Sequence, residues 1–161
     1  MTERVALDAN VLDWLLEPAH LNALLGLRNR QLLDPIVTAE VAHEIQRMPD
    51  KKAARRQALQ ELISSHFKPV KPTFVPIMGL ARLGLAYIAT PRTQEFLTAV
   101  RERGLRRLDA LHVTNAHFHE CVAFLTRDRR LLKKQEAIQD LTPLRLERPE
   151  VRVRPTVDGT A

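Results

Sequence analysis

The sequence predicts an α/β domain built around a central, mostly parallel sheet. Short apolar runs alternate with helical segments along the chain, which is the order expected when helices connect parallel strands. The run at 122–126 is almost wholly apolar, as in a strand that is buried on both faces. With 161 residues, of which 45% are hydrophobic, the chain has the length and composition of a single globular domain.

In the first part of the chain, local signals mark the starts of two helices. Pro18 suits the first turn of a helix. Thr38 is a good N-cap for a helix in which Val41, Ile45 and Met48 recur at helical spacing. The elements expected here are, in order, a strand at 5–7, a helix at 11–16, a helix at 18–28, a strand at 32–37, the helix capped by Thr38 and a charged helix at 51–65.

The second part begins with a connection at 68–76 that holds three prolines. The elements expected after it are helices at 77–89 and 91–103, a buried helix at 109–120, a strand at 122–126, a short basic helix at 129–135 and an edge strand at either 138–141 or 144–146. From Glu147 onward no apolar periodicity remains. We therefore expect one domain over residues 1–146 and a polar, flexible tail over 147–161.

Four acidic side chains stand out as candidate metal ligands: Asp8, Glu44, Asp109 and Asp128. Asp8 and Asp128 lie at or just beyond the carboxyl ends of predicted strands, where parallel sheets bind their ligands. Carboxylate oxygens are the ligands that Mg²⁺ and Mn²⁺ prefer. If the fold brings the four acids together, they make a site for a hard divalent cation.

Each acid also has a structural interpretation. Asp8 and Asp128 are good helix caps, a role that is compatible with metal binding. Asp109 has two arginines just before it that are alternative partners to a metal. Glu40 lies in a first helical turn, where the helix dipole alone favours an acid, and is expected further toward solvent than Glu44. We therefore favour Glu44 over Glu40 as the ligand.

Polar neighbours of these acids are candidates for supporting roles. Asn10 is placed to orient Asp8 or to donate to a phosphate, and Thr126 is placed to hydrogen-bond a water or a phosphate. His112 lies one helical turn from Asp109. It is either a partner of that acid beyond the direct ligands or a packed polar residue.

The charge of the chain favours a polyanionic partner. There are 25 Lys and Arg residues against 19 Asp and Glu residues, which gives a net charge of +6. Arg127, Arg129 and Arg130 form a basic run beside Asp128, which is either a solvated face or a set of RNA phosphate contacts. Only 4% of residues are aromatic, which argues against base-stacking platforms.

The expected location is cytoplasmic. The chain contains no apolar run of about 18 residues, so no membrane-spanning helix is predicted. The single cysteine, Cys121, has no partner for an intramolecular disulfide, which is typical of proteins in a reducing compartment.

Taken in order, these motifs resemble those of the PIN-domain family of metal-dependent ribonucleases, and within it the VapC-like toxins. The resemblance runs from about residue 4 to residue 135. An apolar strand that ends in Asp-x-Asn resembles the first family motif, and a Thr six residues before a Glu resembles the second. The segments that carry the resemblance are Val5–Asn10, Thr38–Glu44, Asp109–His112 and Leu125–Asp128.

The resemblance implies a three-layer α/β/α sandwich with a central parallel sheet. It implies one or two Mg²⁺ or Mn²⁺ ions held by Asp8, Glu44, Asp109 and Asp128, with Thr38 in a supporting position. The implied activity is endoribonuclease cleavage of an RNA substrate by the toxin of a type II toxin–antitoxin pair, with a small antitoxin and a second copy of the chain as partners. The alternatives are a DNA-directed nuclease and a basic RNA-binding module without catalysis.

Overall fold

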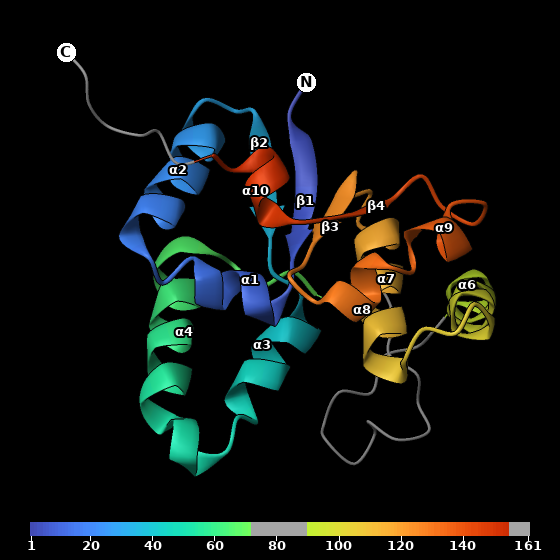
Figure 1. The fold of residues 1–161 in the computed structure, drawn as a ribbon, viewed down its shortest axis with the longest axis horizontal. Helices are drawn as coiled ribbons and strands as arrows, with labels where there is room; N and C mark the ends of the chain where they lie inside the picture. Colours follow the sequence, from blue (N-terminus) through green and yellow to red (C-terminus); the bar gives the residue numbers. More distant parts are fainter. Residues whose placement is uncertain (72–89, 155–161) are drawn as a thin grey trace.

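The computed structural model describes residues 1–71 and 90–154. Its centre is a sheet of four strands in the order β2-β1-β3-β4, and every neighbouring pair is parallel (Figure 1). The strands are β1 (Glu3–Leu7), β2 (Leu33–Ile36), β3 (Ala123–Leu125) and β4 (Arg145–Glu147). The mostly parallel sheet that the alternating pattern predicts is confirmed.

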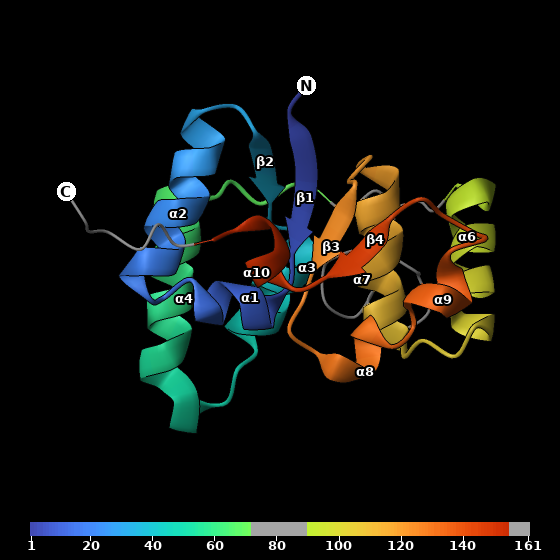
Figure 2. The same ribbon diagram turned by 45° about the horizontal axis from the view of Figure 1, so that its top comes forward.

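Helices cover both faces of the sheet. On one side lie α1 (Ala9–Trp14), α2 (Pro18–Asn29), α3 (Ala39–Gln46) and α4 (Ala53–His66), the last preceded by the 3₁₀ turn η1 (Asp50–Lys52). On the other side lie α6 (Pro91–Glu102), α7 (Arg107–Phe118), α8 (Arg129–Leu132) and α9 (Gln135–Ile138). Figure 2 shows α2 and α4 on one side of the sheet and α6 and α7 on the other. This is the predicted α/β/α sandwich.

Alternating side chains on the strands explain why both faces are covered. Val5 and Leu7 of β1 enter the core beneath α1 to α4, while Ala6 enters the core beneath α6 and α7. On β3, Leu125 packs in the core beneath α1 to α4, and Phe124 packs in the core beneath α6 and α7. A strand that is apolar at every position has no face to offer to water, so it needs helices on both sides.

Local capping sets the helix starts as the sequence predicts. Pro18 occupies the first turn of α2, and the Thr38 hydroxyl accepts a hydrogen bond from the Val41 N–H at 3.4 Å. Gly104 follows α6 with a φ of +81°, a conformation that glycine adopts without steric penalty. These signals act within a few residues, which is why sequence inspection detects them.

The C-terminal elements differ from expectation in detail. Of the two candidate edge strands, the structure contains the later one, as β4, while the earlier segment at 138–141 is not a strand. The single basic helix expected at 129–135 is instead two short helices, α8 and α9. The buried helix expected at 109–120 begins at Arg107 and ends at Phe118.

The packed part of the chain extends beyond the boundary expected at residue 146. Glu147 belongs to β4, and α10 (Pro149–Arg152) follows it. Val153 is 1% exposed, and the Arg152 guanidinium pairs with Glu147 at 2.6 Å and also with Glu3. A long-range ion pair and a buried valine, rather than local periodicity, fix this segment. Three segments lie outside the described residues: residues 155–161, the helix expected at 77–89 and most of the 68–76 connection.

The helices of the described part of the chain include none with the length and apolar character needed to span a membrane.

Candidate metal centre

The candidate site lies at the carboxyl end of the two central strands. β1 and β3 are parallel neighbours with Leu7 opposite Leu125, so the residues that follow them emerge side by side. The Asp8 N–H donates to the Leu125 carbonyl at 3.0 Å and continues the ladder by one step. This register brings Asp8 next to Thr126, although the two lie 118 positions apart in the sequence.

Asp8 is buried and held by three donors. Its carboxylate accepts hydrogen bonds from the Ala9 N–H at 2.8 Å, the Asn10 Nδ2 at 2.7 Å and the Thr126 hydroxyl at 2.6 Å. Burial raises the pKa of Asp8, while the positive charge of His112 and the Thr126 hydrogen bond act in the opposite direction. The Ala9 contact shows that Asp8 also caps α1, as the structural interpretation predicts.

Asn10 and Thr126 connect Asp8 to the loop that carries Asp128. The Asn10 Oδ1 accepts from the Arg127 N–H at 2.8 Å, and the Thr126 hydroxyl accepts from the Asp128 N–H at 3.0 Å. Asp128 in turn caps α8 by accepting from the Arg130 N–H at 2.7 Å. Both connecting side chains thus fix the position of one acid relative to the other.

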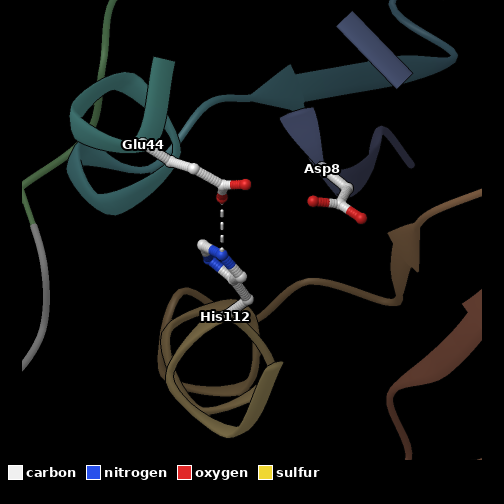
Figure 3. A group of neighbouring side chains, drawn as sticks. All are labelled: Asp8, Glu44 and His112. Atoms are coloured by element: carbon white, nitrogen blue, oxygen red, sulfur yellow. Dashed lines mark ion pairs between the residues drawn. The ribbon is translucent and has the colours of Figure 1, made fainter. Parts of the chain in front are cut away.

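Glu44 and His112 approach Asp8 from the two helical layers (Figure 3). Glu44 comes from α3 and His112 from α7, and the distance from the His112 Nε2 to a Glu44 carboxylate oxygen is 3.4 Å. One potential ligand atom of each of Asp8, Glu44 and His112 lies within 4.8 Å of the other two. Burial disfavours the charged form of His112 and acts to lower its pKa. The hydrogen bond to Glu44 and the negative charge of Asp8 outweigh this effect, so the pKa of His112 is raised.

Asp109 lies on α7, one turn before His112, and is partly buried. Burial, followed by the negative charges of Asp128 and Asp8, raises the pKa of Asp109. These three carboxylates are therefore close enough to repel one another. Within the described ranges Asp109 forms no ion pair, although the charge of Arg106 does act to lower its pKa.

Glu40 is the site residue that sequence reasoning misplaced. We expected it to face solvent more than Glu44 does, but Glu40 is partly buried whereas the Glu44 side chain is 47% exposed. Both Glu40 carboxylate oxygens are buried without a hydrogen bond of good geometry from the residues described, although Thr38 and Asn115 lie near enough to act on its pKa. Burial raises the pKa of Glu40, and the charge of His112 opposes the rise. The helical wheel of α3 alone missed this because the burial involves α7.

The basic run lies beside the site. Arg127, Arg129 and Arg130 are all exposed, next to the cap formed by Asp128. The Arg127 guanidinium is 3.5 Å from a carboxylate oxygen of Glu150 on α10. Arg129 and Arg130 have no acidic partner among the described residues, so their charge is available to an anion.

The donor set fits a divalent cation. Burial, and then the charges of Asp128 and Asp8, raise the pKa of Asp109, and burial raises that of Asp8, so a bound cation would stabilise the ionised form of both acids. Carboxylate oxygens supply the hard ligands that Mg²⁺ and Mn²⁺ take. Among the described residues, the side chains that bring potential ligand atoms within 4.8 Å of one another are Asp8, Glu44 and His112. Asp109 and Asp128 lie outside that group, although the charges of Asp128 and Asp8 act on Asp109.

Comparison with known proteins assigns the family. The PIN domain family matches residues 5–137. The chain belongs to the PIN domain family. A solved structure, the crystal structure of VapBC2 from Rickettsia felis bound to a DNA fragment from their promoter, contains a similar chain: TM-score 0.54 and 13% identity, over 90% of this chain and 98% of that one. No curated protein sequence matches the chain at a significant level.

The family and the fold therefore confirm the resemblance drawn from the four motifs. PIN domains are generally nucleases, and the three-layer fold is shared with the VapBC2 chain. At 13% identity, the solved structure supports the fold alone.

Proposed function

We propose that this protein is a divalent-metal-dependent endoribonuclease and the toxin of a type II toxin–antitoxin pair. The observation that carries the proposal is the convergence of carboxylates from β1, α3, α7 and the loop after β3 at one edge of a parallel sheet, in a chain of the PIN family. Burial and the charges of Asp128 and Asp8 raise the pKa of Asp109, and a bound cation would oppose that rise. Asp8 and Asp128 also cap α1 and α8, a role that is compatible with metal binding.

The chemistry that a bound Mg²⁺ or Mn²⁺ supplies is activation of a water for attack and stabilisation of charge on the phosphoryl oxygens. In-line attack on the phosphodiester would leave a 5′-phosphate and a 3′-hydroxyl. Asp8, Glu44 and Asp109 serve as the principal ligands, and Asp128 acts directly or through a water. The three donors on Asp8 hold its carboxylate in place before the ion arrives.

Several residues orient this set. Asn10 and Thr126 fix Asp8 against the Asp128 loop and present polar atoms to a phosphate or a water. Thr38 caps α3 and thereby fixes the helix that carries Glu44.

The exposed arginines beside the site are placed to contact the RNA backbone. Arg129 and Arg130 lie on α8, directly after Asp128, and Arg127 lies just before it. Contacts of this type position a strand without reading its sequence. The net charge of +6 further favours a polyanion as the substrate.

The proposed protein partners are a small antitoxin and a second copy of the chain. Support for the antitoxin comes from the similar fold found in the VapBC2 complex. A basic surface would attract an acidic segment of such a partner as well as RNA.

The proposal is tested with Asp8→Asn and Asp109→Asn, with Asp140→Asn as a matched control. Asp140 is an exposed acid that pairs with Arg103, so its loss should leave activity unchanged. On an RNA that the wild type cuts in Mn²⁺, the two site variants should lose cleavage while their circular dichroism spectra match the wild type. Retained turnover in both site variants would reject the assignment.

The same assay separates the alternatives. Cleavage of single-stranded DNA of the same sequence at an equal rate would favour a DNA-directed nuclease. Salt-sensitive RNA binding with no cleavage, unchanged by EDTA, would favour a binding module without catalysis.

A further inference from the structure

We propose that His112 is a nitrogen ligand of the cation, together with Asp8 and Glu44, and that this centre discriminates in favour of Mn²⁺ over Mg²⁺. The inference rests on the proposed function, because it concerns the same ion. It goes further because it assigns a ligand role to a residue outside the four acids and a preference for Mn²⁺ over Mg²⁺ to the site.

The positions of the three side chains match a coordination sphere. The ligand atoms come from three different elements and all lie within 4.8 Å of one another. Adjacent ligands of a six-coordinate ion with bonds of about 2.1 Å lie roughly 3 Å apart. The 3.4 Å between the His112 Nε2 and the Glu44 carboxylate is already close to that spacing. Figure 3 shows the imidazole directed toward the Glu44 carboxylate, with Asp8 to one side of the pair.

His112 is a buried polar residue, and its described polar contact is the Glu44 carboxylate, 3.4 Å from its Nε2. The residue is 4% exposed, and its ring lies nearly parallel to that of Phe124, at 14° and 6.0 Å between centroids. Its Nδ1 is buried without a hydrogen-bond partner. An apolar side chain would fill the same space without leaving a polar atom unsatisfied. A ligand role explains why an imidazole stands there.

Glu40 is placed to be the positioning residue for His112. Metal-ligating histidines usually donate the second ring N–H to a carboxylate, which fixes the ring and its tautomer. Glu40 lies one turn before Glu44 on α3, and both of its carboxylate oxygens are buried without a hydrogen bond of good geometry, although Thr38 and Asn115 act on its pKa. Glu40 and His112 are close enough for each to shift the pKa of the other. A side-chain movement that brought Glu40 to the His112 Nδ1–H would give that unpaired nitrogen an acceptor.

A mixed set of nitrogen and oxygen ligands changes the metal preference. Mg²⁺ takes oxygen ligands almost exclusively, whereas transition ions also accept imidazole. We expect Mn²⁺ to bind about tenfold or more tightly than Mg²⁺. His112→Gln should weaken Mn²⁺ binding by about tenfold or more and leave Mg²⁺ binding nearly unchanged, because only the nitrogen is lost.

The decisive experiment is pulsed electron paramagnetic resonance of Mn²⁺ bound to the full chain. A nitrogen bonded to Mn²⁺ modulates the electron spin echo, and the modulation changes when ¹⁴N-histidine is replaced by ¹⁵N-histidine. We expect an isotope-sensitive modulation in the wild type that persists in His119→Gln and disappears in His112→Gln. His119 is the matched control because it follows the far end of α7. Glu40→Gln should retain the modulation but lower Mn²⁺ affinity by about 10–100-fold.

The outcomes separate the two proposals. Stoichiometric Mn²⁺ without histidine modulation in the wild type would overturn the ligand role of His112 and leave the four-acid centre standing. Persistence of the modulation in His112→Gln would assign it to another of the six histidines and also overturn the inference. The isotope comparison in the wild type needs no variant, so a misfolded variant does not prevent the test. Absence of any bound Mn²⁺ would contradict the proposed function itself.

Discussion

Thr126→Val tests the hydrogen bonds that orient Asp8. Thr126 is fully buried, and its hydroxyl donates to the Asp8 carboxylate at 2.6 Å while accepting from the Asp128 N–H at 3.0 Å. Valine has nearly the same shape but neither donates nor accepts. The variant therefore removes one of the three donors on the Asp8 carboxylate and leaves the partly buried Asp128 N–H without its acceptor.

The expected loss of stability follows from these two contacts. A hydrogen bond to a charged group contributes about 1.5–3 kcal/mol, and a neutral one about 1 kcal/mol, so the loss should be about 2–4 kcal/mol. In a chain of this length, 1 kcal/mol lowers Tm by about 2–4 °C, so Tm should fall by about 4–16 °C. Thermal unfolding in EDTA, followed by circular dichroism, measures the change directly.

Thr126→Ser is the matched control. It keeps the hydroxyl and removes one buried methyl group, which should cost about 1 kcal/mol. The valine variant should therefore unfold at a lower temperature than the serine variant, and it should bind Mn²⁺ more weakly because Asp8 loses one of the three donors that hold it. A valine variant as stable as the serine variant would refute the claim that these contacts organise the site.

Three further predictions concern charge and burial. Because the pKa of Asp109 is raised, the folded protein binds a proton there more tightly than the unfolded chain, so ionisation of this group above its ordinary pKa lowers stability. In EDTA, the Tm of Asp109→Asn relative to the wild type should therefore rise between about pH 4 and about pH 7, and a constant difference would contradict this. Burial raises the pKa of Cys121 to about 12, so Ellman's reagent should react slowly with the native protein and rapidly once it is unfolded at the same pH; equal rates would show that the thiol is accessible. Arg103→Ala removes an exposed ion pair with Asp140 and a hydrogen bond to the Ala137 carbonyl, and because exposed pairs contribute little it should lower stability only slightly in chemical denaturation; a loss as large as that of Thr126→Val would contradict this.

Most of the fold, and the positions of Asp8 and Asp128 at one edge of the sheet, could be predicted from local sequence patterns. β1 and β3 read as apolar runs, and an acid at or just beyond the end of such a run must lie at the carboxyl edge of a parallel sheet. Asp8 and Asp128 are placed by that rule alone. The helix cap at Thr38 is equally local, and it sets the start of the helix that carries Glu44.

Features that depend on contacts between distant segments were missed. The Glu40 carboxylate is buried near His112 and Asn115 of α7. The sequence of α3 alone does not indicate which helix packs against it. The α10 segment packs through Val153 and through the pairing of Arg152 with Glu3, at the other end of the chain. The proximity of His112 to Asp8 and Glu44 likewise became visible only once α3 and α7 were placed against each other.

The most direct test of the central claim is Mn²⁺ binding by electron paramagnetic resonance, measured on wild type, Asp109→Asn and Asp140→Asn. The claim is that acids from separate elements form one cation site. It predicts stoichiometric binding of one or two ions to the wild type, equal binding to Asp140→Asn and clearly weaker binding to Asp109→Asn. Absence of binding by the folded wild type at millimolar Mn²⁺, or equal binding by all three proteins, would contradict it.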